Sequence, residues 1–499
     1  MRKGRFIIMK KSIFALFVIF ALILPAFMLS CSGDPKDEEQ KSSGEKQENP
    51  DDNAEPEDYF EARKKMPDNL PDVDFDGEDI KIMIHPGSGQ FVLAEEIVGE
   101  VVNDAVYEAN LAVSERFNVN LKLVEENEVT MIGVIKKSVQ AQDDYFNIAF
   151  VHDMLGAPLA FEGFYANFYD MKYLDFDKPW WNRAALDELT VLGQCYMTSP
   201  SMTYMALAKA RVLFLNENKI ADFALALPYN DVIAGTWTLD KLIALTKNTY
   251  QDSNGNGIAD EGDFYGFLTE GALYGYTDNF DIPVFGRDER GLINLATDIP
   301  KMSVVVDKLY DWFFASNDTQ IASDPNNLSC GEFANGQTLI QRGQLFESLP
   351  NLLSSEISYG ILPMPKYDEN QKSYITQCGE FLCVVPSTMQ DESLDRLSII
   401  MEAMCAEGYK KIFPAYFEIA LQIKYFDNQS IQMLDIINES RRPSFTYIYD
   451  NNIGAAYILY NIFVTGSPSR DFVSFYDKRI SQLEKVTDKM NDSFEKMAG

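Results

Sequence analysis

In the run IKIMI (Ile80–Ile84) isoleucine occupies every second position, a spacing that predicts a β-strand with one buried face. Apolar residues recur every four positions within Val101–Phe117, which predicts a helix with one apolar face. Val119–Leu123 alternates again and predicts a second strand, and after a further predicted helix the run FNIAFV (Phe146–Val151) predicts a third, buried strand. The order strand, helix, strand, helix, strand predicts an α/β fold with a mostly parallel sheet and helices on both faces.

Two loops follow the carboxyl ends of predicted strands. His85 begins the loop after the first strand, and His152 and Asp153 follow the third strand. Ligands of open α/β sheets bind outside the carboxyl ends of the strands, so these loops are candidates for one edge of a binding cleft. The alternative is that both loops only connect a strand to the next helix.

The most specific local motif is DSNGNGIADEGD (Asp252–Asp263). Counted from its first residue, oxygen-bearing side chains stand at positions 1, 3, 5, 9 and 12, and a glycine stands at position 6, where an EF-hand loop turns sharply. The alternative is an Asn-Gly turn held by its own hydrogen bonds. The spacing predicts a structural Ca²⁺ site with the ligands Asp252, Asn254, Asn256, the carbonyl of Ile258, Asp260 and Asp263.

The N-terminus has the pattern of a secretory signal. Five basic residues precede an apolar run that ends just before Cys31, and an acidic segment rich in Gly, Ser, Pro, Asn and Gln follows. Residues 28–31 (MLSC) are similar to a lipobox, in which Cys31 receives a lipid. We predict a signal peptide at residues 1–30 and a lipid-anchored, disordered acidic linker at 31–78. An ordinary signal peptide with a cysteine near its cleavage site is the alternative.

The acidic balance of the chain excludes several classes of partner. The formal net charge is −33, and removal of the five basic residues of the predicted signal takes it to −38. Such a charge argues against nucleic acid and anionic lipid headgroups as partners. Apart from Cys31, the cysteines form an odd, scattered set that predicts free buried thiols, although Cys378 and Cys383 could pair.

The motifs of common enzyme classes do not occur in the sequence. The chain has two His residues and no Gly-x-Ser-x-Gly elbow, His-Glu-x-x-His pair or phosphate-binding glycine loop. Because the chain has 76 acidic residues, a carboxylate pair for glycoside hydrolysis stays open as an alternative, but no pair stands out. The sequence therefore favours a binding protein over an enzyme.

Several short motifs occur in a fixed order along the chain: FLNE (Phe214–Glu217), LPY (Leu227–Tyr229), GTWT (Gly235–Thr238), the Asp252–Asp263 loop and FYGF (Phe264–Phe267). With this set the chain resembles the family 1 extracellular solute-binding proteins of ABC importers. It is further similar to a branch of that family common in Firmicutes, through GEVVNDAVY (Gly99–Tyr107), KPWWN (Lys178–Asn182) and GILPMPKY (Gly360–Tyr367). The resemblance covers residues from about 80 to 475.

The resemblance implies a two-lobe, type II periplasmic-binding-protein-like α/β fold, with mixed sheets flanked by helices and a hinge between the lobes. Lobe 1 is expected at residues 79–198 with 386–430, and lobe 2 at 199–385 with 431–499. The segments that cross between the lobes are expected near Met197–Met202 and Gly379–Pro386.

The same resemblance implies a function. We expect a monomer, lipid-anchored at the extracellular face of the cell membrane, that captures a carbohydrate, in particular an oligosaccharide. It would deliver this ligand to the permease subunits of an ABC importer. The alternatives are a surface carbohydrate-binding or adhesin-type lipoprotein without transport, and a glycoside-active enzyme.

Ligand-binding residues are also implied. Asp153 stands where sugar-binding relatives carry an Asp after the third strand, and Gln344 and Phe346 follow a glycine after which relatives carry a sugar-stacking Trp. Such a site suits an uncharged or weakly polar sugar, with an aromatic ring against its apolar face. For any single aromatic residue, packing in the core is the alternative. The complete set of expected ligand-binding residues is Asp153, His152, His85, Trp181, Trp180, Phe346, Gln344 and Glu380.

Overall fold

The structure is a computed structural model that describes residues 61–379, 381–420, 428–450 and 455–498. The predicted signal peptide, Cys31 and Glu380 lie outside the described residues. Among the helices in those ranges, none combines the length and the apolar character needed to cross a membrane.

The three strands predicted first form one sheet. β1 (Glu78–Ile84) pairs in parallel with β2 (Val119–Glu125) on one side and with β3 (Ile148–His152) on the other. β12 (Phe381–Val384) pairs with β3 in the antiparallel direction, so that the strand order is β12-β3-β1-β2. The predicted parallel core of this sheet is therefore confirmed, and a distant segment adds one antiparallel edge strand.

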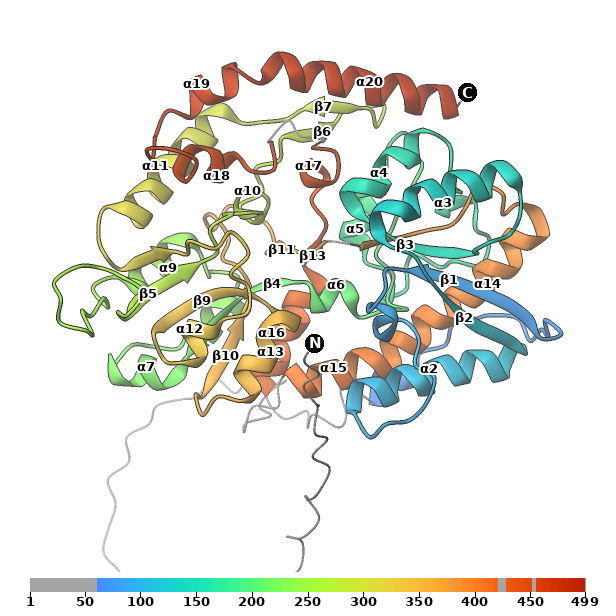
Figure 1. Ribbon diagram of the computed structural model, residues 1–499, viewed down its shortest axis with the longest axis horizontal. Helices are drawn as coiled ribbons and strands as arrows, with labels where there is room; N and C mark the ends of the chain where they lie inside the picture. The colour runs from blue at the N-terminus through green and yellow to red at the C-terminus, as the bar shows by residue number, and fades with distance from the viewer. Residues whose placement is uncertain (1–60, 380, 421–427, 451–454, 499) are drawn as a thin grey trace, which may run out of the picture. The chain divides into compact units, whose positions relative to one another are not determined.

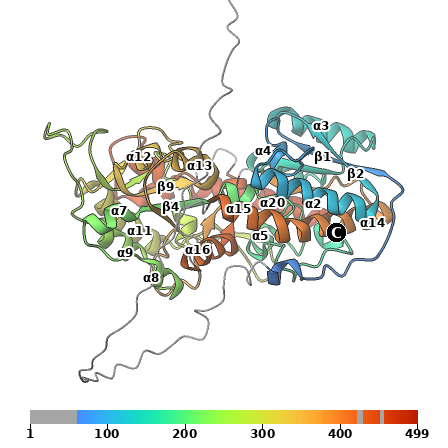
Figure 2. The same cartoon turned by 90° about the horizontal axis from the view of Figure 1, so that it is seen from below.

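Helices cover both faces of this first sheet. α2 (Val101–Phe117) contacts β2 and α14 (Asp391–Glu407), whereas α3 (Glu128–Ala141) contacts β3 and α4 (Asp153–Phe161). Figures 1 and 2 show α3 and α4 on one side of the sheet and α2 and α14 on the other. The predicted layering is confirmed.

A second sheet has the strand order β10-β4-β9-β5-β8. β4 (Arg211–Asn216) is antiparallel to both β10 (Tyr359–Leu362) and β9 (Thr338–Gln344). β5 (Tyr265–Thr269) is parallel to β9 and to β8 (Thr319–Ile321). Every residue of β4, β5, β9 and β10 is buried, because helices pack on the sheet.

Two short strand pairs and further helices complete the described chain. β6 (Phe285–Arg287) pairs with β7 (Ile293–Leu295), and β11 (Thr376–Gln377) pairs with β13 (Arg441–Arg442). The remaining α-helices are α5 (Arg183–Leu189), α6 (Met205–Ala208), α7 (Glu217–Asp222), α8 (Tyr229–Ile233), α9 (Leu239–Thr246), α10 (Tyr276–Asn279), α11 (Ile299–Phe314), α12 (Gly331–Ala334), α13 (Leu345–Leu353), α15 (Phe413–Ala420), α16 (Asn428–Glu439), α17 (Phe445–Ile448), α18 (Ile458–Phe463), α19 (Phe472–Asp477) and α20 (Ile480–Ala498).

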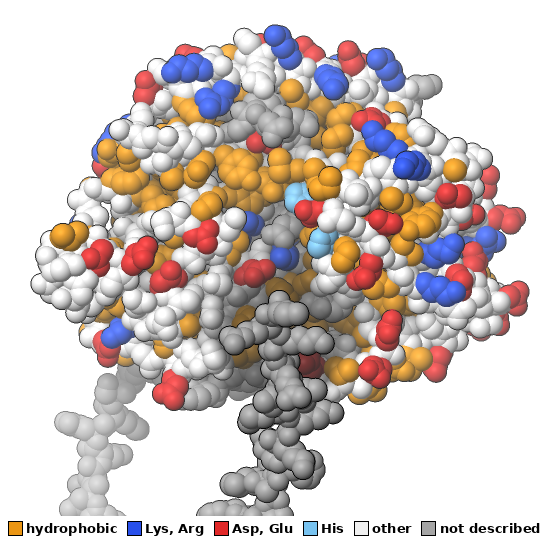
Figure 3. Space-filling model, viewed as in Figure 1, with side chains coloured by type: hydrophobic (Ala, Val, Ile, Leu, Met, Phe, Trp, Pro, Cys, Tyr) orange, Lys and Arg blue, Asp and Glu red, His pale blue; other side chains and the backbone are white. Residues whose placement is uncertain are grey.

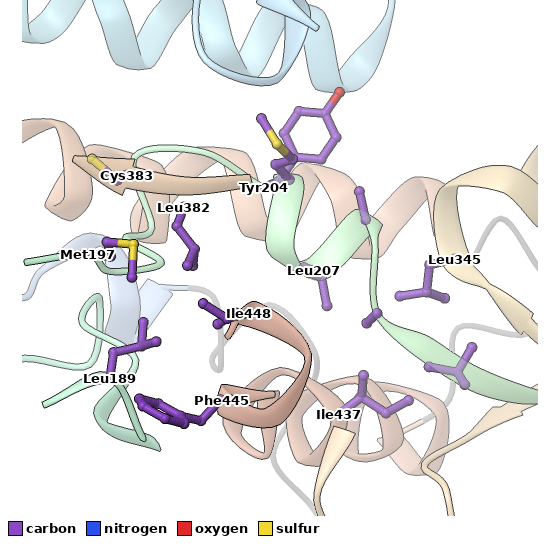
Figure 4. Close-up of a cluster of buried hydrophobic side chains, with 14 of the residues drawn as sticks. Leu189, Met197, Tyr204, Leu207, Leu345, Leu382, Cys383, Ile437, Phe445 and Ile448 are labelled. Atoms are coloured by element: carbon purple, nitrogen blue, oxygen red, sulfur yellow. The ribbon is translucent and has the colours of Figure 1, made fainter. Parts of the chain in front are cut away.

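The two segments predicted to cross between the lobes lie side by side. Thr198 and Cys383 exchange backbone N–H···O hydrogen bonds of 3.1 and 2.8 Å. Cys383 belongs to a cluster of buried apolar side chains that also includes residues of α5, α6, α13, α16 and α17 (Figure 4). β12 belongs to the first sheet, whereas the predicted boundary assigns it to lobe 2. The other lobe boundaries stay predictions.

Residues 61–77 are packed on the folded domain, so the last part of the predicted linker, 31–78, is wrong. Arg63 is 6% exposed, and its Nη2 lies 2.7 Å from Asp435 Oδ1 in α16. The Phe75 N–H donates to the Phe117 carbonyl at 2.8 Å. Four apolar side chains of this segment pack against the core: Met66, Leu70, Val73 and Phe75.

The described cysteines are all buried and free, as predicted. They are Cys195, Cys330, Cys378, Cys383 and Cys405. Burial raises the pKa of the Cys195 thiol to about 12 and that of Cys378 to about 11.

Candidate functional site

A cavity of about 480 Å³ opens beside the carboxyl end of β3 and one edge of the second sheet. Figure 3 shows both histidines near the middle of this face, beside an apolar band and close to basic and acidic side chains. A cavity that combines aromatic rings with a few polar groups is typical of a small-molecule site. The polar and aromatic residues of its lining are His152, Lys209, Arg211, Glu270, Tyr274, Asn326, Ser329, Gln344, Glu347, Tyr447 and Tyr457.

The edge of the second sheet presents polar side chains because β4 begins and β9 ends there. Arg211, the first residue of β4, lies opposite Gln344, the last residue of β9. Two residues earlier on β9, Arg342 is fully buried and forms an ion pair with the buried carboxylate of Glu270. The Arg342 Nη2 also donates to the Tyr274 carbonyl at 2.8 Å. The second sheet thereby holds a neutralised pair of charges at the cavity wall.

Three tyrosines form an aromatic wall. The ring centroid of Tyr274 lies 4.6 Å from that of Tyr447 and 5.9 Å from that of Tyr457, and the last two centroids are 6.1 Å apart. Burial raises the pKa of each of the three hydroxyls, which therefore stay protonated at neutral pH. The wall offers flat apolar faces together with hydroxyl groups that donate and accept hydrogen bonds.

Arg211 links the aromatic wall to the sheet edge. Its Cζ lies 4.4 Å from the ring centroid of Tyr274, and its Nη1 donates to Gln377 Oε1 at 2.7 Å. The Gln377 Nε2 donates in turn to the Tyr274 hydroxyl at 2.7 Å. The guanidinium and the ring are thus held in fixed positions, as a preorganised site requires.

Of the predicted ligand-binding residues, the structure brings His152 and Gln344 to this cavity. Asp153 lies next to it at the start of α4 and does not line it: its side chain is 1% exposed, and its Oδ1 accepts from the Met154 N–H at 2.8 Å. His152 Nδ1 lies 3.3 Å from the same oxygen. The Asp153 carboxylate is therefore buried at the junction of β3 and α4.

His85 and Phe346 lie apart from the cavity lining. The His85 ring packs at a centroid distance of 6.3 Å from Phe381, and the Phe346 ring packs edge-on at 5.1 Å from Phe91. Phe346 is partly buried against the core, which is the alternative stated for single aromatic residues. Glu380 lies outside the described residues.

The expectation that Trp180 or Trp181 faces the cleft is wrong. Their exposures are 0% and 3%, and both indole N–H groups donate to one buried carboxylate, that of Glu402 in α14. The donor–acceptor distances are 2.8 Å for Trp180 and 2.7 Å for Trp181. The pair is buried because its polar atoms find a partner in the core, which a sequence window around the two tryptophans does not reveal.

Several cavity residues were not predicted from the sequence. Arg211 begins β4 and Glu270 follows β5, and a charged residue at the end of a fully buried, mostly apolar strand is an uncommon combination that could have marked both. Tyr274, Tyr447 and Tyr457 lie outside strands, in a chain with 25 tyrosines, so no local signal separates them from core tyrosines.

The loop predicted to bind calcium is held by hydrogen bonds among its own residues. Asp252 accepts from the backbone N–H groups of Gly255 at 2.7 Å and Gly257 at 2.9 Å. Asn254 and Asn256 donate their side-chain amides to the carboxylate of Asp260 at 2.8 and 2.6 Å. These hydrogen bonds also fit the alternative Asn-Gly turn, and among the described residues no group of three or more carboxylate, His or Cys side chains is close enough to hold a metal.

Asp263 closes the loop from the buried side. It is 1% exposed, accepts from the Tyr250 hydroxyl at 2.7 Å and from the Ser253 N–H at 3.0 Å, and these bonds lower its pKa. The set of carboxylates, amides and one carbonyl is of the type that calcium prefers. Calcium binding therefore stays a prediction.

If the loop binds calcium, free Ca²⁺ at one hundred times its dissociation constant should stabilise the protein by about 2–3 kcal/mol. Thermal unfolding with Ca²⁺ and with a chelator measures the difference. Asp252→Ala should abolish it, whereas Asp368→Ala, which removes a turn-capping carboxylate elsewhere, should preserve it. Identical melting curves with and without Ca²⁺ would contradict the prediction.

No protein-family model matches the sequence, and no curated protein sequence matches it. Solved structures do match. A cyclo/maltodextrin-binding protein complexed with maltotetraose superposes with a TM-score of 0.53 at 14% identity, over 84% of this chain and 97% of that chain. The maltose-binding periplasmic protein MalE from Listeria monocytogenes, in complex with maltose, gives 0.51 at 14% identity, over 82% and 99%.

UgpB from Mycobacterium tuberculosis, in complex with glycerophosphocholine, gives a TM-score of 0.51 at 13% identity, over 83% of this chain and 99% of that chain. At such identities the likeness shows the fold. The predicted two-lobe, periplasmic-binding-protein-like α/β fold is confirmed.

Proposed function

We propose that the chain is an extracellular solute-binding protein that captures a carbohydrate, in particular an oligosaccharide, and delivers it to the permease subunits of an ABC importer. The observation that carries the proposal is the wall of Tyr274, Tyr447 and Tyr457 beside a polar sheet edge. A pyranose has an apolar C–H face that packs on a flat ring, and its hydroxyls pair with groups such as those of Gln344 and His152.

The structural neighbours support this proposal. Two of the three are described with a bound maltose or maltodextrin, and none of the three is described as an enzyme. Closure by a hinge around a ligand is a known transition of periplasmic binding proteins, and in this chain it would let an importer distinguish the loaded protein from the empty one.

Isothermal titration calorimetry against mono- and oligosaccharides tests the function, with small-angle scattering to detect compaction on closure. Tyr447→Ala should weaken sugar binding roughly 10- to 150-fold, since loss of a ring contact removes about 1.5–3 kcal/mol of apolar burial. The matched control is Tyr145→Ala, because Tyr145 is 40% exposed and is not part of the lining. Tight binding of a peptide or amino acid, with no saccharide bound at millimolar concentration, would contradict the carbohydrate assignment.

We also propose that Cys31 is the lipid attachment site and that the protein is anchored at the outer face of the cell membrane. The support is the sequence pattern around Cys31, in which an apolar run ends at MLSC (residues 28–31). Cys31→Ala should move the protein from the membrane fraction to the soluble fraction, because the lipid attached to Cys31 supplies the membrane attachment. Fractionation with immunoblotting measures this, and a wild-type protein that is already soluble would contradict it.

A further inference from the structure

The cavity contains a cation that forms no ion pair with any residue that the structure describes. Arg342 is paired with Glu270, and the Lys209 Nζ lies 3.4 Å from Glu347 Oε1. Within the described part of the chain, Arg211 forms no ion pair: its hydrogen-bond partner is the neutral amide of Gln377, and its guanidinium stacks on Tyr274. After the pairs are counted, Arg211 is the cation that the cavity presents.

The Arg211 side chain also has a hydrogen-bond donor without an acceptor among the described residues. The residue is 9% exposed, and its Nε–H is buried without a hydrogen-bond partner among the described residues. A buried donor without an acceptor costs free energy, and the side chain that carries it lines the cavity. The planar fork of an arginine matches the two oxygens of a carboxylate or a phosphate better than it matches a single hydroxyl.

The carboxylate of Asp153 does not fill this position. Asp153 lies outside the cavity lining, and its Oδ1 is engaged by the Met154 N–H and lies near His152 Nδ1. The negative charge of Asp153 raises the pKa of Tyr274 and Tyr447, and the positive charge of Arg211 lowers it. Both charges therefore lie near the same two rings. Arg211, in contrast, lines the cavity, and its Nε–H has no acceptor among the described residues.

We infer that the solute is an acidic saccharide, whose sugar ring packs on the tyrosine wall while an anionic oxygen, from a carboxylate or a phosphate, accepts from the Arg211 guanidinium. This inference rests on the proposed carbohydrate function and replaces the expectation of an uncharged sugar. The guanidinium stacked on Tyr274 places the anion at the edge of the aromatic wall. A sugar bearing its charge beside the ring fits that arrangement.

Matched ligand pairs test the inference on the wild-type protein. A panel of uronic-acid disaccharides is titrated by calorimetry beside their uncharged methyl esters, and a panel of sugar phosphates beside the parent neutral sugars. The anionic member should bind roughly 10- to 100-fold more tightly, as a charge-assisted hydrogen bond implies. Rising ionic strength should weaken the acid more than the ester.

Variants of Arg211 localise the effect. Arg211→Met should remove the preference for the anionic member, and Arg211→Lys, which keeps the charge without the fork, should reduce it. Arg183→Met is the control, since it changes the net charge equally at a side chain of α5 that is 66% exposed. If Arg211→Met fails to fold in a thermal melt, the Lys variant and the wild-type ligand pairs still decide.

Each outcome has one meaning. Preference for uronates identifies a carboxylate, and preference for sugar phosphates alone identifies a phosphate. Equal affinity for charged and uncharged members, or a preference that Arg211→Met leaves intact, overturns the inference while the proposed function stands. Failure of every saccharide to bind at millimolar concentration overturns the proposed function, and the inference with it.

Discussion

Arg342→Met should destabilise the protein by about 3–5 kcal/mol, the cost of leaving one member of a buried ion pair without its partner. The side chain of Arg342 is 0% exposed and that of Glu270 is 2% exposed, so water cannot solvate the remaining carboxylate. The variant also removes the hydrogen bond to the Tyr274 carbonyl. Urea unfolding followed by linear extrapolation gives the free energy of unfolding.

Two further variants separate the ion pair from the packing of the side chain. Lys308→Met breaks the pair with Asp240, whose side chain is 69% exposed, and should cost less than about 1 kcal/mol. Glu270→Gln combined with Arg342→Met removes both charges and should recover part of the loss, which a double-mutant cycle quantifies. A loss for Arg342→Met no larger than that for Lys308→Met would show that the buried charge is not the cause.

Glu402 should make the free energy of unfolding fall by about 3 kcal/mol as the pH rises from about 4.5 to about 7. Burial raises the pKa of this carboxyl from 4.5 to about 7, although the indole N–H donors of Trp181 and Trp180 favour the ionised form. The folded protein therefore retains a proton that the unfolded chain has already lost. The contribution of Glu402 is complete below pH 4.5 and is lost as the pH passes through about 7.

Glu402→Gln tests this directly, because the amide keeps the shape of the side chain and cannot ionise. Unfolding free energies measured between pH 5 and 8 should fall less steeply in the variant than in the wild type. Burial also raises the pKa of Asp278 to about 6, and the variant keeps that contribution, so the difference between the two proteins belongs to Glu402. Parallel pH profiles would contradict the prediction.

Local pattern was sufficient for the first sheet. The alternation in residues 80–84 and the apolar run 146–151 each predict a strand, and parallel pairing of β1 with β2 and β3 follows from the helices between them. The position of β12 in the sheet could not be predicted from local pattern, because β12 follows β3 by more than two hundred residues in the sequence. In the second sheet the antiparallel pairing of β4 with β9 and β10 is likewise non-local.

The site was predictable only where it follows from strand ends. His152 ends β3, where the rule that ligands bind at strand ends predicts a site residue, whereas Gln344, which ends β9, was implied by the family resemblance. The tyrosine wall joins one loop to the C-terminal segment and depends on tertiary packing. The prediction for the two tryptophans was wrong for a related reason. Their hydrogen-bond partner, Glu402 in α14, lies 222 residues from Trp180 and 221 residues from Trp181.

Chemical labelling of the buried thiols can measure local opening of the folded protein. A thiol reagent attacks the thiolate, and burial both hides the described cysteines and keeps them protonated. The native protein should therefore label slowly, and each label should mark a local opening event. Cys383 lies in one of the two segments predicted to cross between the lobes, and Cys330 precedes α12, beside the second sheet. Peptide-resolved labelling rates, compared with and without ligand, would report separately on motion at the crossing and inside one lobe.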